Sequence, residues 1–180
     1  MRAPLWAWLI LAAAPAQADE SDLCVAAAQD AERLSGVPLD VLLAVSLTET
    51  GQGGRPWPWT VNLEGEGHRF ATRDEATAFA EAALAAGRDS FDVGCFQLNW
   101  RWHGDKFVSV AQAFDPLANA SYAAAFLRDL GAELGDWSVA AGAYHSRTPA
   151  RVAPSSGRTS RPRRGSMPSS ARRPGETARR

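Results

Sequence analysis

The chain of 180 residues is long enough for one compact domain with a hydrophobic core and too short for two ordinary domains. Its net charge of −1 combines two unlike parts. Residues 19–149 carry 9 Arg and Lys against 19 Asp and Glu, whereas residues 150–180 carry 9 Arg against one Glu. Because phosphate binding requires a basic face, the acidic part excludes a typical nucleic-acid-binding domain, and no nucleic-acid partner is expected.

The first eighteen residues have the pattern of a secretory signal peptide. Arg2 precedes an apolar run from Leu5 to Ala14, and residues 16–18 (Ala-Gln-Ala) match an A-x-A cleavage site. The run is shorter than the roughly 20 residues that a helix needs to span a bilayer. We therefore expect cleavage after Ala18, export from the cytoplasm and no transmembrane anchor in the mature protein. An uncleaved anchor is the alternative.

Two helices are predicted for residues 22–35 and 38–50. Ser21 or Asp22 can cap the first helix, and Gly36 can end it. Pro38 suits the first turn of the second helix, which Gly51 closes. The second helix is apolar nearly all round, so we expect it to be buried. The residues behind this expectation are Leu39, Leu42, Leu43, Val45 and Leu47.

A hairpin or two strand fragments are predicted for residues 59–71, because glycine and proline residues before this segment break the helical pattern. Thr72 and Glu75 then have the spacing of a capping box ahead of a helix over residues 75–86. Gly87 follows this helix as a stop signal. The segment 51–87 is therefore expected to contribute a small β element and one helix.

Two more helices are predicted in the second half of the chain. Asp115 and Pro116 begin one that runs to about Leu134, and Asp136 can cap another over residues 137–145. The expected inward stripe of the longer helix comprises Ala118, Tyr122, Ala125, Phe126 and Leu130. The fold class expected from the whole pattern is mainly α with a small β element.

The composition changes after Ala150 to mostly arginine, serine, proline, glycine, alanine and threonine, without an aromatic residue. Such a segment cannot bury enough apolar surface to offset its ordering entropy, so residues 150–180 are expected to be disordered. A solvated tail is the simpler interpretation, and binding to anionic cell-wall polymers is the alternative. The expected organisation is a signal peptide (1–18), one domain (19–149) and this tail (150–180).

Cys24 and Cys95 are the two cysteines of the chain. An even pair in an oxidising compartment favours a disulfide, which would join the first helix to the stretch "FDVGCFQLNW" at residues 91–100. Two buried free thiols are the alternative, because the sequence does not supply the distance between the two Cα atoms.

Glu49 is the candidate catalytic acid. It lies in the last turn of the apolar segment "VLLAVSLTET", where desolvation and the negative end of the helix dipole both favour the protonated carboxyl. A protonated glutamic acid is what a general acid needs to protonate a glycosidic oxygen. The alternative is a surface glutamate at a frayed helix end.

The stretch at residues 91–100 supplies candidate ligand-binding groups. The amides of Gln97 and Asn99 offer donors and acceptors that suit sugar hydroxyl and acetamido groups, and Gly94 permits close approach of a ligand. Ordinary turn residues are the alternative. Four tryptophans flank these groups and could pack on sugar rings, although filling of the core is their commoner role. They are Trp57, Trp59, Trp100 and Trp102.

Neither a metal nor another cofactor is expected. The three histidines are widely spaced, two cysteines complete no tetrahedral ligand set, and the sequence has no P-loop and no glycine-rich dinucleotide fingerprint. Tyr144, in "AGAYHSRTP" near the end of the expected domain, could place a phenol beside a carboxyl group. An interfacial core tyrosine is the alternative interpretation.

These motifs occur in a familiar order. A glutamate that closes a buried helix, then "VGCFQLN", then an Ala-Tyr pair resembles the lysozyme-like lytic transglycosylases with the soluble-lytic-transglycosylase (SLT) catalytic domain. The resemblance covers roughly residues 22–149 and is greatest for the small periplasmic branch, which has "WPWTVN", "DVGCFQLN", "AFDP" and "YHS" blocks. It implies an α+β lysozyme-like fold with a small β element beside an active-site cleft, and a periplasmic enzyme.

The resemblance also implies roles for individual residues. Glu49 would be the single catalytic acid and base, and Tyr144 would hydrogen-bond and orient it. The residues implied to line the glycan cleft are Thr50, Trp59, Asn62, Gly94, Phe96, Gln97, Asn99 and His145. Two positions depart from the common pattern: Thr50 replaces a serine and keeps its hydroxyl, and His145 replaces an asparagine, as it does in the small periplasmic branch.

The activity implied by the resemblance is cleavage of the bond between N-acetylmuramic acid and N-acetylglucosamine in peptidoglycan. Glu49 would protonate the bridging oxygen and then accept the proton of the C6 hydroxyl, which attacks C1. The product would be a 1,6-anhydromuramic end formed without water. Because the nucleophile is tethered to the reacting sugar, one carboxyl group is enough. An envelope-spanning secretion or flagellar complex is left open as a partner.

Two other functions stay open at this point. A hydrolytic muramidase on the same fold would need a second carboxylate, for which Glu64, Glu66 and Asp92 are candidates by position. Asp92 could equally cap the turn that follows it. A glycan-binding or assembly module without catalysis is the third possibility, although binding alone needs no desolvated acid.

Overall fold

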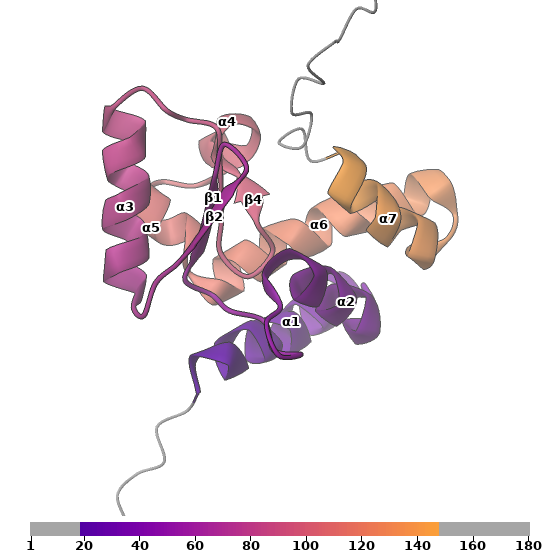
Figure 1. The fold of residues 1–180 in the computed structure, drawn as a ribbon. Helices are drawn as coiled ribbons and strands as arrows, with labels where there is room; N and C mark the ends of the chain where they lie inside the picture. The colour runs from indigo at the N-terminus through magenta and orange to yellow at the C-terminus, as the bar shows by residue number, and fades with distance from the viewer. Residues whose placement is uncertain (1–18, 148–180) are drawn as a thin grey trace, which may run out of the picture.

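The computed structural model describes residues 19–147 and has a mainly helical fold with a small antiparallel sheet (Figure 1). The mainly α class with a small β element, predicted from the sequence, is confirmed. The expected signal peptide and basic tail lie outside the described residues. The helices are α1 (Glu20–Ser35), α2 (Leu39–Thr50), α3 (Arg73–Ala85), α4 (Trp100–His103), η1 (Gly104–Lys106), α5 (Val110–Ala113), α6 (Pro116–Leu134) and α7 (Trp137–Arg147). The strands are β1 (Thr60–Leu63), β2 (Glu66–Arg69), β3 (Phe91–Val93) and β4 (Leu98–Asn99).

Most of the predicted helix ends are confirmed. Thr72 and Glu75 form the capping box that begins α3. The side chain of Asp115 accepts from the Ala118 amide at the start of α6, and Asp136 accepts from the Val139 amide at the start of α7. These side chains satisfy amides that have no partner within the helix, which explains why such residues predict helix starts well.

The predicted cap of α1 was wrong. Asp19, rather than Ser21 or Asp22, caps this helix, and its carboxylate accepts from the Ser21 amide. Ser21 is instead a buried helical residue, 2 % exposed. Asp22 lies inside the helix as well, so both predicted caps belong to its first turn.

The predicted inward stripe of α6 was also largely wrong. Of its five residues only Leu130 is fully buried. α6 packs along α1, and the buried residues of both helices are mostly alanines, which let the two backbones approach closely. Tyr122 and Phe126 lie beside this contact and are only partly buried. The buried face of α6 comprises Asn119, Ala120, Ala123, Ala124, Leu127 and Leu130.

The expectation that α2 is buried all round holds for only part of the helix. Leu42 and Val45 are buried, together with the polar residues Ser46 and Thr50. Leu47 is 38 % exposed. The helix contacts α1 on one side and α7 on another, so its remaining surface, including part of its apolar surface, is left to solvent.

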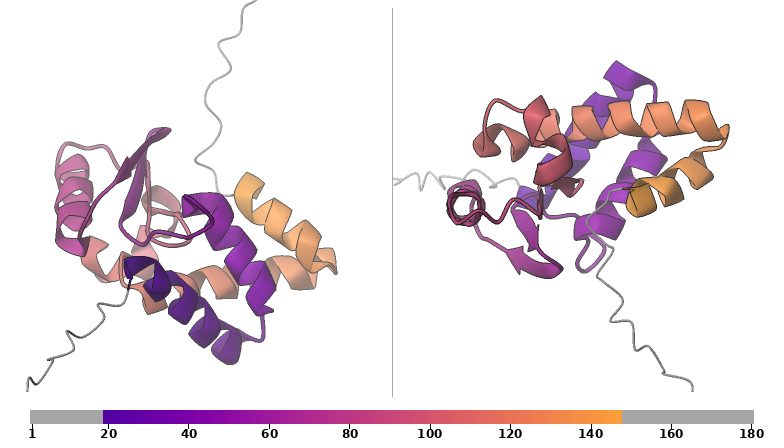
Figure 2. Two further views of the ribbon diagram at one scale, coloured as in Figure 1. Left: turned by 60° about the horizontal axis from the view of Figure 1, so that its bottom comes forward. Right: turned by 90° about the horizontal axis from the view of Figure 1, so that it is seen from above.

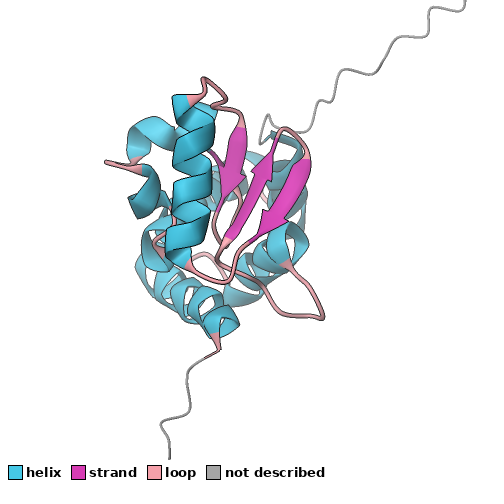
Figure 3. Cartoon of the chain, turned by 60° about the vertical axis from the view of Figure 1, so that its left-hand side comes forward, coloured by secondary structure: helices cyan, strands magenta, loops and turns pink. Residues whose placement is uncertain are grey.

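The sheet has the strand order β2-β1-β3-β4, with every pair antiparallel, and residues 59–71 contain the predicted hairpin. Side chains alternate between its two faces. One face is apolar and is covered by α3, which contributes buried alanines to the second hydrophobic cluster (Figure 3). The other face carries Asn62, Asp92 and Asn99 in register on three neighbouring strands.

Two hydrophobic clusters make up the core. The larger one joins α1, α2, α6 and α7, and α1 and α6 lie side by side within it (Figure 2). The smaller one lies between the sheet, α3 and α5. The stretch at residues 91–100 supplies side chains to both clusters, because Phe91 and Val93 belong to the smaller one and Phe96 and Leu98 to the larger one. This stretch therefore connects the two halves of the fold.

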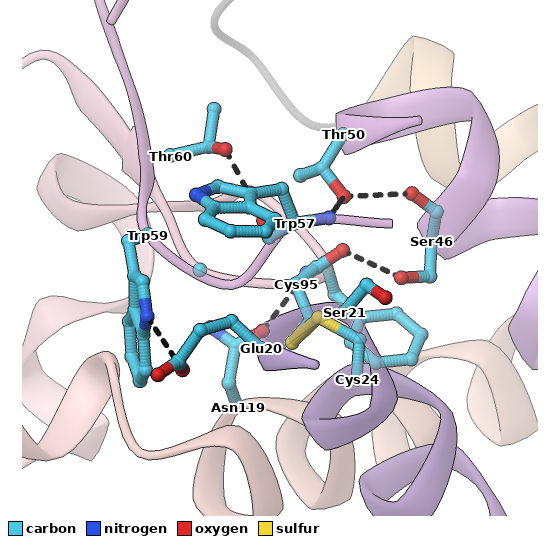
Figure 4. Close-up of a disulfide and its surroundings, with 12 residues drawn as sticks. Glu20, Ser21, Cys24, Ser46, Thr50, Trp57, Trp59, Thr60, Cys95 and Asn119 are labelled. Atoms are coloured by element: carbon cyan, nitrogen blue, oxygen red, sulfur yellow. Dashed lines mark hydrogen bonds between the residues drawn. A yellow bond between two sulfur atoms is a disulfide. The ribbon is translucent and has the colours of Figure 1, made fainter. Parts of the chain in front are cut away.

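The predicted disulfide is confirmed. Cys24 of α1 and Cys95 are bonded, with their Cα atoms 5.6 Å apart, and both residues are buried (Figure 4). The bond closes a loop with a sequence separation of 71 residues. It attaches the larger helical cluster to the loop that follows β3.

Replacing both cysteines with alanine should lower the free energy of unfolding by about 2–4 kcal/mol, because the cross-link removes loop-closure entropy from the unfolded chain. Urea denaturation of the double variant, beside the reduced wild type, measures this change. A double variant as stable as the oxidised wild type would contradict the prediction.

Candidate functional site

The site is built around a buried loop, residues 94–97, which we call the central loop. Two of its residues have left-handed backbone conformations: Gly94 with φ +81° and Gln97 with φ +46°. A Cβ at position 94 would lie 2.5 Å from Nδ2 of Asn119, so both the conformation and the space require glycine there. The central loop can therefore pack directly on the side chain of a helix behind it.

That side chain, Asn119 of α6, is fully buried and makes hydrogen bonds with three backbone groups. Its Oδ1 accepts from the Phe96 amide at 2.9 Å. Its Nδ2 donates to the Val93 carbonyl at 3.1 Å and to the Ala113 carbonyl at 2.9 Å. One amide side chain thus joins β3, the central loop and the end of α5, and its removal would leave three buried polar groups without a partner.

Two further side chains hold the central loop against helices. Ser46 of α2 donates to the Cys95 carbonyl at 2.9 Å, as Figure 4 shows, and Tyr144 of α7 donates to the Phe96 carbonyl at 2.9 Å. The central loop therefore binds the last turns of both α2 and α7. This arrangement sets the position of the neighbouring residues on these two helices, Glu49 and His145.

Glu49 and His145 form a pair across α2 and α7. Nδ1 of His145 lies 2.8 Å from Oε1 of Glu49, although the residues are 96 positions apart in the sequence. The glutamate side chain is 8 % exposed and the histidine side chain 37 % exposed. A nearly buried carboxyl group is thus in contact with a half-buried ring that reaches solvent.

A pocket of about 320 Å³ opens at this pair. Its other walls are small or apolar, and a Cβ at Gly142 would meet no atom within 4 Å, so this wall is open. Ala141 and Gly142 precede His145 by four and three positions, which places them beside it on the same side of α7. The lining residues are Ala44, Val45, Thr48, Glu49, Ala141, Gly142 and His145. A ligand in this pocket would meet the carboxyl group of Glu49.

The end of α2 is held by polar contacts next to Glu49. Thr50 is 4 % exposed, and its hydroxyl donates to the Ser46 carbonyl and accepts from the Trp57 amide. Arg69 of β2 donates to the Thr50 carbonyl at 2.6 Å, which places a positive charge at the negative end of the helix dipole. Thr50, implied by the resemblance to bind substrate, thus has both of its polar functions occupied by the protein.

Tyr144 lies within the electrostatic reach of Glu49. Burial raises the pKa of the Tyr144 phenol well above its usual value, and the negative charges of Glu49 and Asp92 raise this pKa further. The phenol therefore stays protonated and acts as a donor. Its hydrogen bond to the Phe96 carbonyl connects the position of α7 to the central loop. The direct bond to Glu49 that the resemblance implied stays a prediction.

The central loop and the residues after it are buried. Gly94 and Phe96 are buried, Gln97 is 5 % exposed and Asn99 is 0 % exposed. The Gln97 amide donates to the carbonyls of Thr60 and Gly94, and the Asn99 amide donates to Asp92 at 2.7 Å. These bonds lie within the protein, and none of the four residues lines the pocket at Glu49.

Gln97 offers a matched test of this arrangement. Gln97→Ala should lower the free energy of unfolding by about 2 kcal/mol, because two buried carbonyls lose a partner. Gln97→Gly loses the same bonds but relieves the left-handed conformation, so it should be about 1 kcal/mol more stable than Gln97→Ala. Urea denaturation of the two variants measures both values. The reverse order of stability would contradict the assignment of strain to this residue.

The two remaining residues expected in the cleft lie elsewhere. Trp59 is 5 % exposed, and its indole N–H donates to Glu20 at the start of α1, as Figure 4 shows. Asn62 is half-buried on β1 and accepts from the Gly65 amide in the hairpin turn. Trp59 is thus a core residue of the smaller cluster, whereas Asn62 lies on the polar face of the sheet beside Asp92.

Sequence reasoning missed Asn119 and Arg69. Asn119 lies within "LANASYA", where nothing distinguishes a buried asparagine from an exposed one, and the only available signal was an amide on the buried side of a predicted helix. Arg69 lies on an exposed strand and reaches the end of α2 through the tertiary fold. Both residues position Glu49 through the backbone.

Within residues 19–147 no group of three or more histidine, cysteine, aspartate or glutamate side chains is arranged to hold a metal ion, and no helix is long and apolar enough to cross a membrane. Comparison with known proteins finds no matching family model, no matching curated protein and no matching solved structure. The interpretation of the site therefore rests on its residues and their geometry.

Proposed function

We propose that this chain is a peptidoglycan lytic transglycosylase that cleaves the β-1,4 bond between N-acetylmuramic acid and N-acetylglucosamine, with Glu49 as acid and base. The observation that carries the proposal is the position of Glu49: a side chain that is 8 % exposed, at the end of a helix, on the wall of a pocket. A general acid must lie within hydrogen-bond reach of the oxygen that it protonates, and a ligand in this pocket would lie beside Glu49.

The proposed reaction needs one carboxyl group. Glu49 protonates the bridging oxygen while positive charge develops at C1 of the muramic ring. The carboxylate then accepts the proton of the C6 hydroxyl as that oxygen bonds to C1, so Glu49 ends the cycle protonated. The nucleophile belongs to the sugar itself, which supplies an entropic advantage over attack by a free water.

The arrangement of elements supports the same proposal. A helical part, a small antiparallel sheet and an acid at the end of a helix agree with the lysozyme-like fold that the sequence motifs imply. The proposal places the protein in the periplasm, which rests on the signal-peptide pattern of residues 1–18. Its macromolecular partner there is the glycan strand.

Asp92 favours a hydrolytic muramidase as the second candidate. Its side chain is on the polar face of the sheet, it is 6 % exposed, and its charge acts on Tyr144 together with that of Glu49. A second carboxylate near the acid is what hydrolysis would require. Its hydrogen bond from Asn99 is the contact that weighs against this role, because it joins β3 to β4.

Mass spectrometry of the muropeptides released from purified sacculi tests the proposal. The mature protein should release fragments with 1,6-anhydromuramic ends. Reducing ends would overturn the transglycosylase proposal and point to a hydrolase that uses Asp92. No release by folded protein, with retention of the protein on sacculi, would point to a glycan-binding module.

A further inference from the structure

Arg69 of β2 is a positive charge that the fold holds beside the end of α2 without pairing it with a carboxylate. Its Nη2 donates to the carbonyl of Thr50, the residue after Glu49, at 2.6 Å. Within residues 19–147 no ion pair joins Arg69 to an acidic side chain. The cations there that do bond a carboxylate are Arg33, Arg55, Arg88, Arg101, Lys106 and Arg128.

The contacts of Arg69 leave its guanidinium fixed but accessible. Its Cζ lies 5.6 Å from the centroid of the Trp57 ring, so the cation packs over an aromatic face. Trp57 is itself held, because its amide donates to the Thr50 hydroxyl, as Figure 4 shows, and its indole N–H donates to the Phe70 carbonyl. A guanidinium has five N–H donors, and Arg69 is exposed. The donors that the Thr50 carbonyl does not use can therefore meet a ligand.

The electrostatics of Arg69 differ from those of a paired arginine. Partial burial lowers the pKa of its guanidinium. Hydrogen-bonded carboxylates raise the pKa of Arg88 and that of Arg101 instead. The charge of Arg69 is thus balanced by a carbonyl dipole and an aromatic ring rather than by an anion, which leaves it able to attract one.

The register of the sheet places Arg69 on its polar face. Arg69 is paired with Thr60, and Thr60 is two residues from Asn62, so these three side chains project from the same side. Gly67 is the direct partner of Asn62 on that side, and a Cβ there would meet no atom within 4 Å. Asn62 and Arg69 are therefore diagonal neighbours, about 7–8 Å apart in a typical pair of strands, with open space beside them.

Asn62 adds a second donor. Its Oδ1 accepts from the Gly65 amide at 2.9 Å, and its Nδ2 makes no hydrogen bond within the part of the chain that the structure describes. Asp92, the acidic residue of this face, is 6 % exposed, accepts from Asn99 and lies one strand further from the edge. The groups that the edge offers to a ligand are thus the N–H groups of Asn62 and Arg69. A ligand here must be an acceptor, and a planar carboxylate matches a guanidinium best.

We propose that Arg69 and Asn62 bind a carboxylate of the peptide stem that peptidoglycan carries on N-acetylmuramic acid, and that Arg69 is thereby a specificity-determining residue. The identity of the ligand rests on the proposed function. In intact peptidoglycan the lactyl carboxyl group is joined to the stem as an amide, so the free carboxylates belong to the stem. Residues 19–149 carry 19 acidic side chains against 9 basic ones, so an anionic ligand needs a fixed cation at the point of contact.

Binding of a stem peptide tests the inference without any activity measurement. The probe is the stem tripeptide with free carboxylates, added to the mature wild-type protein, beside the same peptide with amidated carboxyl groups. The free peptide should shift the ¹H–¹⁵N signals of Arg69 Nε–H and of the Asn62 Nδ2 group. The amidated peptide should bind at least about tenfold more weakly, as expected for the loss of a charged hydrogen bond. Equal binding of the two peptides, or an unchanged Asn62 response in Arg69→Gln, would overturn the proposal.

Activity supplies a second test with matched variants. On strands with free stem carboxylates the wild type should have a kcat/KM about tenfold higher than on strands with amidated stems, and Arg69→Gln should show no preference. Damage to the end of α2 would lower both values together, so the ratio separates recognition from a structural effect. Arg69→Lys keeps the charge without the planar fork and should retain part of the preference. Arg73→Gln, which also loses a 2.6 Å bond to a backbone carbonyl, is the control and should keep the full preference.

The remaining outcomes separate this inference from the proposed function. A preference that persists in Arg69→Gln would remove Arg69 from substrate recognition. Strands stripped of their stems carry only the lactyl carboxylate, and an equal loss of activity by Arg69→Gln on these strands and on intact ones would overturn the assignment to the stem. A wild-type protein that releases no muropeptides would overturn the proposed function instead, and the peptide titration would still decide whether Arg69 binds a carboxylate.

Discussion

Glu49→Gln should reduce the rate of glycan cleavage by about a hundred- to ten-thousandfold, the contribution that a general acid typically makes. The glutamine side chain has the same shape and can still hydrogen-bond Nδ1 of His145, so the pair and the end of α2 should stay in place. What is lost is the proton that the bridging oxygen needs. Release of soluble muropeptides from sacculi, followed over time, measures the rate.

The stability of this variant must be measured beside its activity. The unfolding free energy of Glu49→Gln should stay within about 1 kcal/mol of the wild type, because the hydrogen-bonding geometry is kept. Glu81→Gln, on the exposed side of α3, makes the same side-chain change away from the pocket and is the matched control, with expected activity equal to that of the wild type. Retained activity in Glu49→Gln would remove Glu49 from the role of acid.

Asn119→Leu should cost at least about 3 kcal/mol of unfolding free energy. The leucine is close in size but cannot bond the Phe96 amide, the Val93 carbonyl or the Ala113 carbonyl, and each buried group left without a partner costs about 1–3 kcal/mol. Denaturation with urea or guanidinium chloride measures the loss. A variant that does not fold at room temperature would agree with it, since a domain of this size is only marginally stable.

Asn62→Leu is the matched control for this prediction. The Asn62 side chain also accepts one hydrogen bond from the backbone. This bond lies in the solvent-exposed hairpin turn, where water can replace the lost side chain as the partner of the Gly65 amide. Its loss should therefore stay below about 1.5 kcal/mol. Similar losses in the two variants would show that Asn119 does not hold the central loop in the way that the structure describes.

Glu49 and Asn119 show which site residues can be predicted from the sequence and which cannot. Glu49 could be found from sequence because its signal is local: a carboxyl group at the end of an apolar helical segment, followed by glycine. Asn119 could not, because its partners Val93, Phe96 and Ala113 meet around it only in the folded chain. Its function is a property of how α6 faces β3 and the central loop.

The stretch at residues 91–100 shows the limit of predicting site residues from the sequence. Its polar side chains were expected to bind a ligand, since Gln97 and Asn99 have the right chemistry to contact a sugar. Both side chains are buried, and their N–H groups donate to Thr60, Gly94 and Asp92. Composition predicts what a side chain can bond, whereas burial decides whether its partner is a ligand or the protein itself.

By itself the sequence determined the helix starts at Thr72, Asp115 and Asp136, the hairpin and the mainly α class, because caps and turns are local signals and the class follows from the pattern of the whole chain. It favoured a bond between the two cysteines, and the structure supplied the Cα distance that allows it. Only the tertiary structure decided which face of α6 is buried and that His145 is the partner of Glu49. Those outcomes depend on how α2, α6 and α7 dock around one loop, and contacts between residues 96 positions apart leave no local pattern in the chain.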